Sequence, residues 1–160
     1  MSGIALRTAL PADREAVIDL IQALNVFENA LTGDRLEGRA AAAASYDHLA
    51  QRVAASQGRL VLAVADREVV GLLGFTIEED QPFVREDVRR YGHVTDLVVH
   101  EAWRGRGVGR RLLEEAERLA RAAGLRRLAI GVLEANEGAA RLYRGFGFGD
   151  YLRVLTKDLA

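Results

Sequence analysis

The sequence of 160 residues contains no cysteine. A disulfide framework, a thiolate metal site and a cysteine nucleophile are therefore excluded. The chain also lacks an apolar run of the roughly 18 residues that are needed to span a bilayer. Its first residues lack the basic-then-apolar pattern of a secretion signal. We therefore expect a cytoplasmic protein that does not act in a membrane.

An excess of charge of one sign is also absent. The 22 Lys and Arg residues nearly balance the 23 Asp and Glu residues, which gives a formal net charge of −1. Nucleic-acid binding needs a concentrated basic surface, so we expect no nucleic-acid partner. What is present is typical of a globular protein, with 49% hydrophobic and 28% charged residues. No linker rich in Pro, Ser or Gly divides the chain, and we predict one α/β domain over residues 1–160.

The first half of the chain alternates helical and strand patterns. Apolar residues at helical spacing follow Pro11-Ala12-Asp13, and a second helix is predicted to reach about Ser56. Two apolar runs flank a polar turn at Asp66-Arg67-Glu68 and predict a β-hairpin in the middle of a sheet. The remaining predictions for this half are a strand over 4–8, a loop or broken helix over 25–38, and a solvated acidic loop over 78–91.

The second half has a clearer periodicity. An apolar stripe that begins at Val108 predicts an amphipathic helix, which Gly124 is well placed to end. The other predicted elements of this half are strands over 93–100 and 128–132, a short helix over 136–144, and a terminal strand over 147–159.

The most informative segment joins the strand over 93–100 to the amphipathic helix. It reads Trp103-Arg104-Gly105-Arg106-Gly107-Val108-Gly109-Arg110. The first turn of a helix has free N–H groups and a partial positive charge, which attract phosphate. Three glycines remove the Cβ atoms that would keep an anion from the backbone, and the arginines add positive charge. The turn therefore suits a diphosphate.

Two common phosphate-binding patterns do not fit this turn. A P-loop requires Gly-Lys-Ser/Thr, whereas Gly109 is followed by Arg110-Arg111. A dinucleotide-binding turn requires G-x-G-x-x-G, which the chain does not complete from either Gly105 or Gly107. The turn also follows a strand in mid-chain, after two helices and a hairpin.

At these residues the sequence resembles the GNAT superfamily of N-acetyltransferases. The acyl-CoA signature of that family, Arg/Gln-x-x-Gly-x-Gly/Ala, is matched by Arg104-Gly105-Arg106-Gly107-Val108-Gly109. A second match lies downstream, where Asn136 is followed seven residues later by Tyr143 and then by Gly145-Phe146. Both motifs occur in the family's order and separation, and the resemblance covers essentially the whole chain. One departure is Glu101, where the family often has proline.

The resemblance implies a fold and a cosubstrate. The fold is α/β, with a mixed, mostly antiparallel central sheet that is splayed between its fourth and fifth strands and has helices on both faces. Acetyl-CoA is the implied cosubstrate, and no metal is implied. Its pantetheine arm would lie along the backbone of Leu97, Val98 and Val99, and its diphosphate on N–H groups of the turn. The implied cofactor-binding residues of the turn are Arg104, Gly105, Arg106, Gly107, Val108, Gly109 and Arg110.

The resemblance also implies roles for the downstream motif. Asn136 would either bond the pantetheine or order the following helix, and Tyr143 would lie near the thioester sulfur. Tyr143 is the candidate acid, because a tyrosine of pKa near 10 protonates a thiolate of pKa about 8.5 at a cost of about 2 kcal/mol. The alternative is that its ring only packs against Phe146 and Phe148.

The base is less well specified. Asp96, Glu79 and Glu78 are the carboxylates best placed on the central strands to accept a proton from an amine. Asp96 could equally be a hydrogen-bonded residue within the sheet. Glu78 and Glu79 have a competing interpretation as solvated side chains.

The expected function is transfer of an acetyl group from acetyl-CoA directly to a primary amine. The amine is expected to belong to a small molecule such as a polyamine or an amino acid. Two alternatives stay open: a protein N-terminus or lysine as acceptor, and a catalytically silent acyl-CoA-binding regulatory module. We further expect a homodimer. The sequence does not name the acceptor, whose contacts we expect from 25–38 and 78–91.

Overall fold

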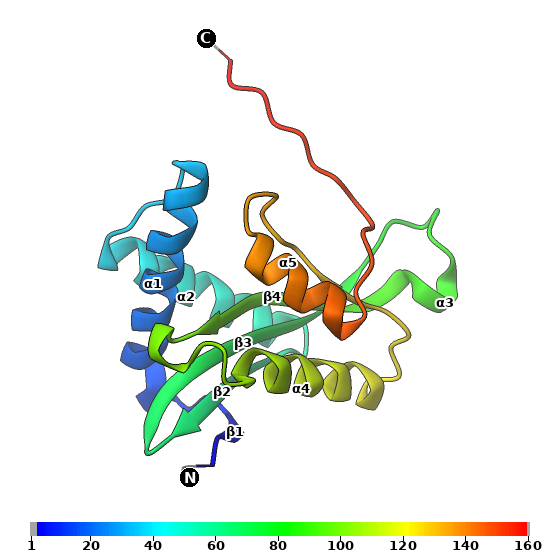
Figure 1. Cartoon of the computed structure of the whole chain (residues 1–160). Helices are drawn as coiled ribbons and strands as arrows, with labels where there is room; N and C mark the ends of the chain where they lie inside the picture. Colours follow the sequence, from blue (N-terminus) through cyan, green and yellow to red (C-terminus); the bar gives the residue numbers. More distant parts are fainter. Residues whose placement is uncertain (1–2, 160) are drawn as a thin grey trace.

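A computed structural model describes residues 3–159 (Figure 1). A five-stranded sheet is surrounded by helices, in line with the α/β fold expected from the sequence. The strands are β1 (Ala5–Thr8), β2 (Arg59–Ala65), β3 (Glu68–Glu79), β4 (Arg90–Val99) and β5 (Leu128–Ile130). The α-helices are α1 (Arg14–Thr32), α2 (Arg39–Ala55), α3 (Glu86–Arg89), α4 (Val108–Ala122) and α5 (Glu137–Phe146). Two 3₁₀ turns are η1 (Pro11–Asp13) and η2 (Glu101–Trp103).

The strand order is β1-β2-β3-β4-β5. The first four strands pair antiparallel, and β5 pairs parallel with β4. The predicted hairpin is confirmed as β2 and β3. The β4–β5 pairing is short, because it joins only Gly92–Val94 to Leu128–Ile130. The mixed, mostly antiparallel sheet expected from the sequence is thus present, and β4 continues well beyond its pairing with β5.

The sheet has an apolar core on each face. On one face α4 packs its predicted stripe, and four of its side chains are buried against β2, β3 and β4. On the other face α1 and α2 cover the sheet. The buried helix residues of the first core are Val108, Leu112, Ala116 and Ala120, and those of the second are Val17, Ile18, Leu20, Ile21, Ala42 and Leu49.

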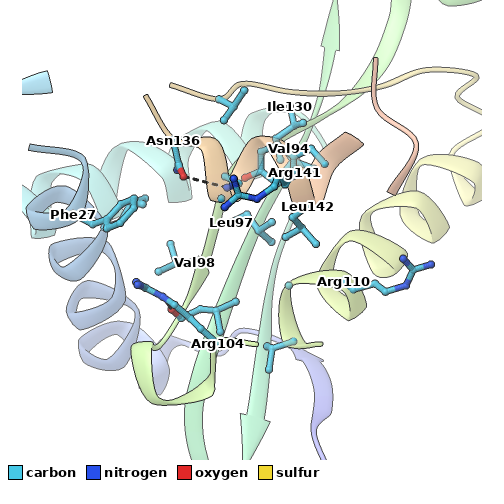
Figure 2. A pocket seen from close by; sticks show the side chains of 18 of the residues that line it. Phe27, Val94, Leu97, Val98, Arg104, Arg110, Ile130, Asn136, Arg141 and Leu142 are labelled. Atoms are coloured by element: carbon cyan, nitrogen blue, oxygen red, sulfur yellow. Dashed lines mark hydrogen bonds between the residues drawn. The ribbon is translucent and has the colours of Figure 1, made fainter. Parts of the chain in front are cut away.

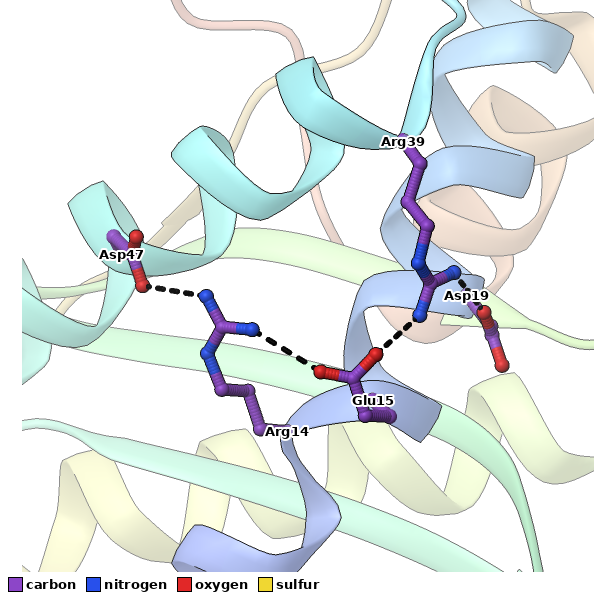
Figure 3. A network of polar contacts seen from close by, with 5 residues as sticks. All are labelled: Arg14, Glu15, Asp19, Arg39 and Asp47. Atoms are coloured by element: carbon purple, nitrogen blue, oxygen red, sulfur yellow. Dashed lines mark hydrogen bonds and ion pairs between the residues drawn. The ribbon is translucent and has the colours of Figure 1, made fainter.

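Ion pairs join α1 to α2 on the outer surface (Figure 3). Arg39 of α2 contacts both Glu15 and Asp19 of α1 at 2.5 Å. Arg14 of α1 contacts Glu15 at 3.1 Å and Asp47 of α2 at 3.4 Å. All five side chains are exposed, so solvent and salt screen these ion pairs and each contributes little to stability. The apolar contacts beneath them therefore dominate the attachment of α2.

Two segments have more regular structure than the sequence predicted. The range 25–38 was expected to be a loop or broken helix, but α1 continues to Thr32. Gly33 ends it in the left-handed conformation, with φ of 72° and its N–H bonded to the Asn29 carbonyl at 2.8 Å. The range 78–91 was expected to be a loop, but β3 reaches Glu79 and the short helix α3 precedes β4.

The terminal strand predicted over 147–159 is wrong. Gly147, with φ of 116°, ends α5 by donating to the Tyr143 and Arg144 carbonyls. Beyond it, the segment 149–159 is exposed and carries neither helix nor strand. Within residues 3–159, its backbone forms no hydrogen bond with other backbone groups. A strand requires a neighbouring strand edge, and this segment runs away from the sheet instead (Figure 1).

Candidate active site

A cleft opens where β4 separates from β5. Pairing between the two strands ends at Val94 and Ile130. Beyond this point β4 continues to Val99, whereas the segment that follows β5 turns away from it. The separation leaves a cavity of about 890 Å³, walled by β4, α1, α4, α5 and the chain after β5 (Figure 2). Leu97, Val98 and Val99, for which the resemblance implies contact with pantetheine, line this cavity. The backbone of this part of β4 therefore faces a space that can accept an extended ligand.

A β-bulge in β4 shapes the floor of the cleft. Gly74 of β3 is opposite Asp96, and the next residue, Phe75, is opposite Val94, so Thr95 has no partner. A Cβ atom at Gly74 would lie 2.3 Å from Thr95 Oγ1 and 3.1 Å from Asp96 Oδ2. The bulge is therefore accommodated by glycine, and it directs two consecutive polar side chains toward the same region.

The turn after β4 forms one end of the cleft. Gly105 and Gly107 adopt positive φ angles of 71° and 79°, which favour glycine, and open space lies where their Cβ atoms would be. Gly107 is the N-cap of α4. The N–H groups of the following three residues have no acceptor within the helix, because they belong to its first turn. Gly105, Gly107, Val108, Gly109 and Arg110 line the cavity, so the turn and the N-terminus of α4 open into it.

Gly109 has a different role from the other two glycines. A Cβ atom there would lie 3.1 Å from Leu142 Cδ2 of α5. The absence of a side chain allows α5 to pack closely against the first turn of α4. Gly109 therefore helps to set the width of the cleft between these helices.

The predicted arginines differ in their positions. The Arg104 side chain lies over the Phe27 ring at 5.4 Å and donates from Nε to the Val99 carbonyl at 3.2 Å. Arg106 lies over the Trp103 ring at 4.9 Å and does not line the cavity. Arg110 pairs with Glu114 at 3.2 Å and extends along α4, away from the cleft centre (Figure 2). Arg141 of α5, which the sequence analysis missed, also lines the cavity.

The downstream motif lies on α5, across the cleft from β4. Asn136 is the N-cap of α5, and its Oδ1 accepts a hydrogen bond from the Ala139 N–H at 3.1 Å (Figure 2). Of its two implied roles, ordering the helix is therefore the one with a contact in this structure. Asn136 also lines the cavity, which keeps its amide near the ligand space.

Tyr143 is the buried residue of α5 and lines the same cavity. Its ring is 6.1 Å from that of Phe148 in an edge-on arrangement, so the packing interpretation is also satisfied. Burial raises the pKa of Tyr143 to about 12, and the charge of Glu28 adds to the effect. The phenol therefore retains its proton at neutral pH.

Two carboxylates are candidates to contact an acceptor: Glu28 lines the cleft, whereas Asp96 does not, although its neighbours Thr95 and Leu97 do. Burial raises the pKa of Asp96, which follows the bulge at Thr95. Glu28 of α1 lines the cavity, and Arg35 Nε donates to its Oε2 at 2.9 Å. The charge of Glu28 also contributes to raising the pKa of Asp96, so the two groups interact. The sequence analysis missed Glu28, although it lies in the range 25–38 from which acceptor contacts were expected.

Glu78 and Glu79 are not brought into this cavity. Hydrogen bonds from Thr76 and Arg52 lower the pKa of Glu78, which makes it a weaker base. Glu79 is opposite Arg90 at the start of β4, the far end of that strand from the phosphate-binding turn. Both carboxylates instead line a smaller pocket beside Arg90. None of the three predicted bases therefore lines the cavity, and Asp96 is the one whose neighbours in sequence, Thr95 and Leu97, both do.

Residues 3–159 contain neither a metal-binding cluster nor a membrane-spanning helix. No group of three or more His, Cys, Asp or Glu side chains is arranged to hold a metal ion there. No helix in that range is long and apolar enough to cross a membrane.

Comparison with known proteins gives one family match and one curated relative. The sequence profile of the acetyltransferase (GNAT) family matches residues 24–148. The relative is an uncharacterised N-acetyltransferase, YycN of Bacillus subtilis, which is 28% identical over 98 residues. The match spans 61% of this chain and 59% of YycN, so about two fifths of YycN lies outside it.

Solved structures share the fold along nearly the whole chain. A mutant of the BH1408 protein from Bacillus halodurans superposes with a TM-score of 0.85 at 19% identity, covering 98% of this chain and 99% of that one. The aminoglycoside N-acetyltransferase AAC(6')-Iy, solved in complex with CoA, gives a TM-score of 0.74 at 19% identity. It covers 99% of this chain and 96% of that enzyme.

Proposed function

Because this chain belongs to the GNAT acetyltransferase family, we propose that it transfers an acetyl group from acetyl-CoA directly to a primary amine of a small molecule. Family membership supports acyltransferase activity, and the donor, the acceptor and the residue roles are our proposal. The observation that carries it is the cleft between β4 and α5, whose lining includes both the N-terminus of α4 and the carboxylate of Glu28. On this proposal, residues 1–160 form one acyltransferase domain.

The phosphate-binding end fits the diphosphate of CoA. Free N–H groups of the first turn of α4 point into the cleft, and Arg104 and Arg141 add positive charge beside them. Gly105 and Gly107 have no side chain, and open space lies where a Cβ atom would be, so access of an anion to the backbone is not blocked there. The edge of β4 from Leu97 to Val99 has no β5 partner and would pair with the amide groups of pantetheine. A structural relative, AAC(6')-Iy, has been solved with CoA bound, which supports this assignment.

Tyr143 is proposed to give its proton to the leaving thiolate. Acetyl-CoA supplies the activated acyl group as a thioester. With a pKa of about 12 for Tyr143, protonation of a thiolate of pKa about 8.5 is uphill by about 5 kcal/mol. A turnover of about 10 per second corresponds to a barrier of about 16 kcal/mol, so this step fits beneath it. Burial would raise the pKa of a thiolate in the same cleft, which reduces the difference.

Asp96 and Glu28 are proposed to receive the amine. A lysine-like amine of pKa about 10.4 is neutral in only about one molecule in 2,500 at pH 7, so removal of its proton costs about 4.6 kcal/mol. A carboxylate whose pKa is raised, as burial raises that of Asp96, is a stronger base. Glu28 would attract the ammonium form from solvent and hold it beside Asp96. Glu79 remains a candidate base but is less favoured, because neither of its neighbours in sequence lines the cavity, whereas both neighbours of Asp96 do.

The decisive experiment is a thiol-release assay with acetyl-CoA and a panel of amines. We expect release that depends on the amine and depends on enzyme concentration, with a mass increase of one acetyl group on the amine. Binding of acetyl-CoA without release for any small amine, peptide N-terminus or lysine peptide would support the silent acyl-CoA-binding module instead. Release only with peptides would identify a protein acceptor.

A further inference from the structure

The cleft wraps around the free edge of β4 and so has two sides. Leu97 and Val98 are consecutive in β4, and their side chains point to opposite faces of the sheet. Leu97 packs against the core on the α4 face and Val98 belongs to the core on the face covered by α1 and α2, yet both line the cavity. Figure 2 shows Phe27 and Val98 on one side of the cleft and Leu142 on the other. In the proposed reaction acetyl-CoA lies along the β4 edge and toward α5, which leaves the α1 side to the acceptor.

One face of α1 forms this acceptor side. Leu24, Phe27 and Glu28 line the cavity, and their spacing of three and four residues places them on the same face of the helix. Val26 is also an exposed apolar residue of α1, but it does not line the cavity. Two of the three side chains from α1 are apolar, and Val98 of β4 adds a third apolar group. The acceptor side is therefore an apolar surface that contains one charged group.

The charges around the cavity are unevenly distributed. Glu28 is the only carboxylate among the described residues that line it. The positive side chains of the same lining are Arg104, Arg110 and Arg141. Part of the charge of Glu28 is already balanced, because Arg35 donates a hydrogen bond to it at 2.9 Å. The acceptor side can therefore balance the charge of one ammonium group and not of two.

The single carboxylate and the apolar surface differ in what surrounds them. The negative charge of Glu28 helps to raise the pKa of both Tyr143 and Asp96, so Glu28 lies near the groups proposed to move protons. Phe27 lies beneath the guanidinium of Arg104, which is 5.4 Å from the centre of its ring. A second ammonium group beside Phe27 would lose its hydration and meet a like charge that already lies over the ring. An apolar group in the same place carries no such cost and gains buried contact.

We propose that the acceptor is a primary monoamine with an apolar body, whose ammonium group is received at Glu28 and whose apolar chain or ring packs against Leu24 and Phe27. This inference rests on the proposed function, because it names the class of amine that the same cleft acetylates. It separates that class from polyamines, which carry further cations, and from amino acids, which carry a carboxylate. Glu78 and Glu79, whose charges would suit a polycation, lie outside the cavity.

Three amines with the same unbranched six-carbon chain test the class of acceptor. Hexylamine, 1,6-diaminohexane and 6-aminohexanoate differ only in the group at the far end, which is a methyl, an ammonium or a carboxylate. Thiol release at saturating acetyl-CoA gives kcat/KM for each. We expect the value for hexylamine to be at least about 10-fold higher than either other value, after correction for the two amines of the diamine, because a charged end group must lose its hydration. An equal or higher value for either charged amine would overturn the proposal.

A change of charge at Phe27 should reverse this selectivity. Phe27→Glu places a second carboxylate on the acceptor face of α1, so the ratio of kcat/KM for hexylamine to that for the diamine should fall by at least about 10-fold. Phe27→Leu keeps an apolar side chain and should keep the preference for hexylamine. Val26→Glu adds the same charge at a neighbouring exposed position that does not line the cavity, and the ratio should not change. An equal fall in both Glu variants would assign the effect to general electrostatic attraction and overturn the proposed contact.

Calorimetry provides a readout that does not depend on turnover. Hexylamine should bind the CoA-loaded protein, and Phe27→Asn should weaken that binding by about 10-fold because it removes apolar contact. Val26→Asn is the matched control and should bind hexylamine as the natural chain does. Absence of binding, or binding that Phe27→Asn leaves unchanged, would overturn the proposal.

The two proposals fail in different ways. A natural chain that acetylates amines without preferring hexylamine refutes the apolar class of acceptor and leaves the proposed function in place. A natural chain that acetylates no amine refutes the proposed function. In that case the calorimetric comparison of Phe27→Asn with Val26→Asn still decides whether the α1 side of the cleft is a site for apolar amines.

Discussion

The two proposed binding regions of the cleft are built in different ways. The proposed phosphate-binding end uses the backbone of one short segment, in which the glycines at 105 and 107 and the start of α4 are neighbours in sequence. The proposed acceptor end uses side chains from separate elements, with Glu28 of α1 in the lining of the cavity and Asp96 of β4 buried between two residues that line it. A backbone site is formed by consecutive residues, whereas a side-chain site is formed by residues that are distant in sequence and that packing brings together. The first end can therefore be recognised in a sequence, and the second is free to vary with the acceptor.

The largest effect is expected at the phosphate-binding end. Gly107→Asp should weaken acetyl-CoA binding by more than about 100-fold, because a like charge beside the diphosphate costs several kcal/mol. Isothermal titration calorimetry measures the affinity. Gly107→Asn is the matched control, since Asn has nearly the same shape and tolerates the positive φ of 79°. Equal loss in both variants would assign the effect to the backbone rather than to charge.

The next effect tests the middle of the cleft, between the two ends. Tyr143→Phe should lower kcat by about 10²–10⁴-fold, because the proton donor is removed while the ring remains. The same variant should bind CoA with nearly natural affinity, as calorimetry can show. Full activity of this variant with the best amine would show that Tyr143 has only a packing role, which its contact with Phe148 also supports.

A smaller effect is expected at the acceptor end. Glu28→Gln should raise KM for a diamine by about 10-fold, since a hydrogen bond to a charged group contributes about 1.5–3 kcal/mol. The loss should shrink as salt rises, because screening weakens the attraction in the natural protein. CoA affinity should not change, which separates this end from the phosphate-binding end. Glu68→Gln, an exposed position on β3, is the control, and an equal change there would contradict a local role for Glu28.

The smallest effect concerns stability at the acceptor end. Burial raises the pKa of Asp96 above its ordinary value of 3.8, so the folded state binds its proton more tightly than the unfolded state does. Its ionisation therefore destabilises the fold as pH rises through the folded-state pKa. Asp96→Asn should raise Tm slightly at neutral pH while it lowers turnover, and the gain in Tm should vanish below about pH 3.8. A Tm that falls at neutral pH would show that the carboxylate is instead stabilised by its surroundings.

The sequence predicted most of the elements because their patterns are local. The apolar stripe of α4 and the hairpin of β2 and β3 are confirmed, and so is the mixed sheet. The extension of α1 to Thr32 was missed, because the polar residues of that turn resemble a loop until Gly33 ends the helix. The bulge at Thr95 could not be predicted from the residues of β4 itself. The residue that accommodates it, Gly74, lies in the neighbouring strand. The cytoplasmic location remains a prediction.

The sequence by itself determined the family, the glycine-rich turn before α4 and the position of Tyr143 on a helix, because each depends on residues that are close along the chain. Tertiary structure alone decided that Glu28 of α1 would share a cavity with Tyr143. It also decided that Glu79 would lie outside that cavity and that residues 149–159 would pair with no strand of the described chain. The physical reason is that side-chain distances between elements are set by packing over the whole core, which no local pattern specifies.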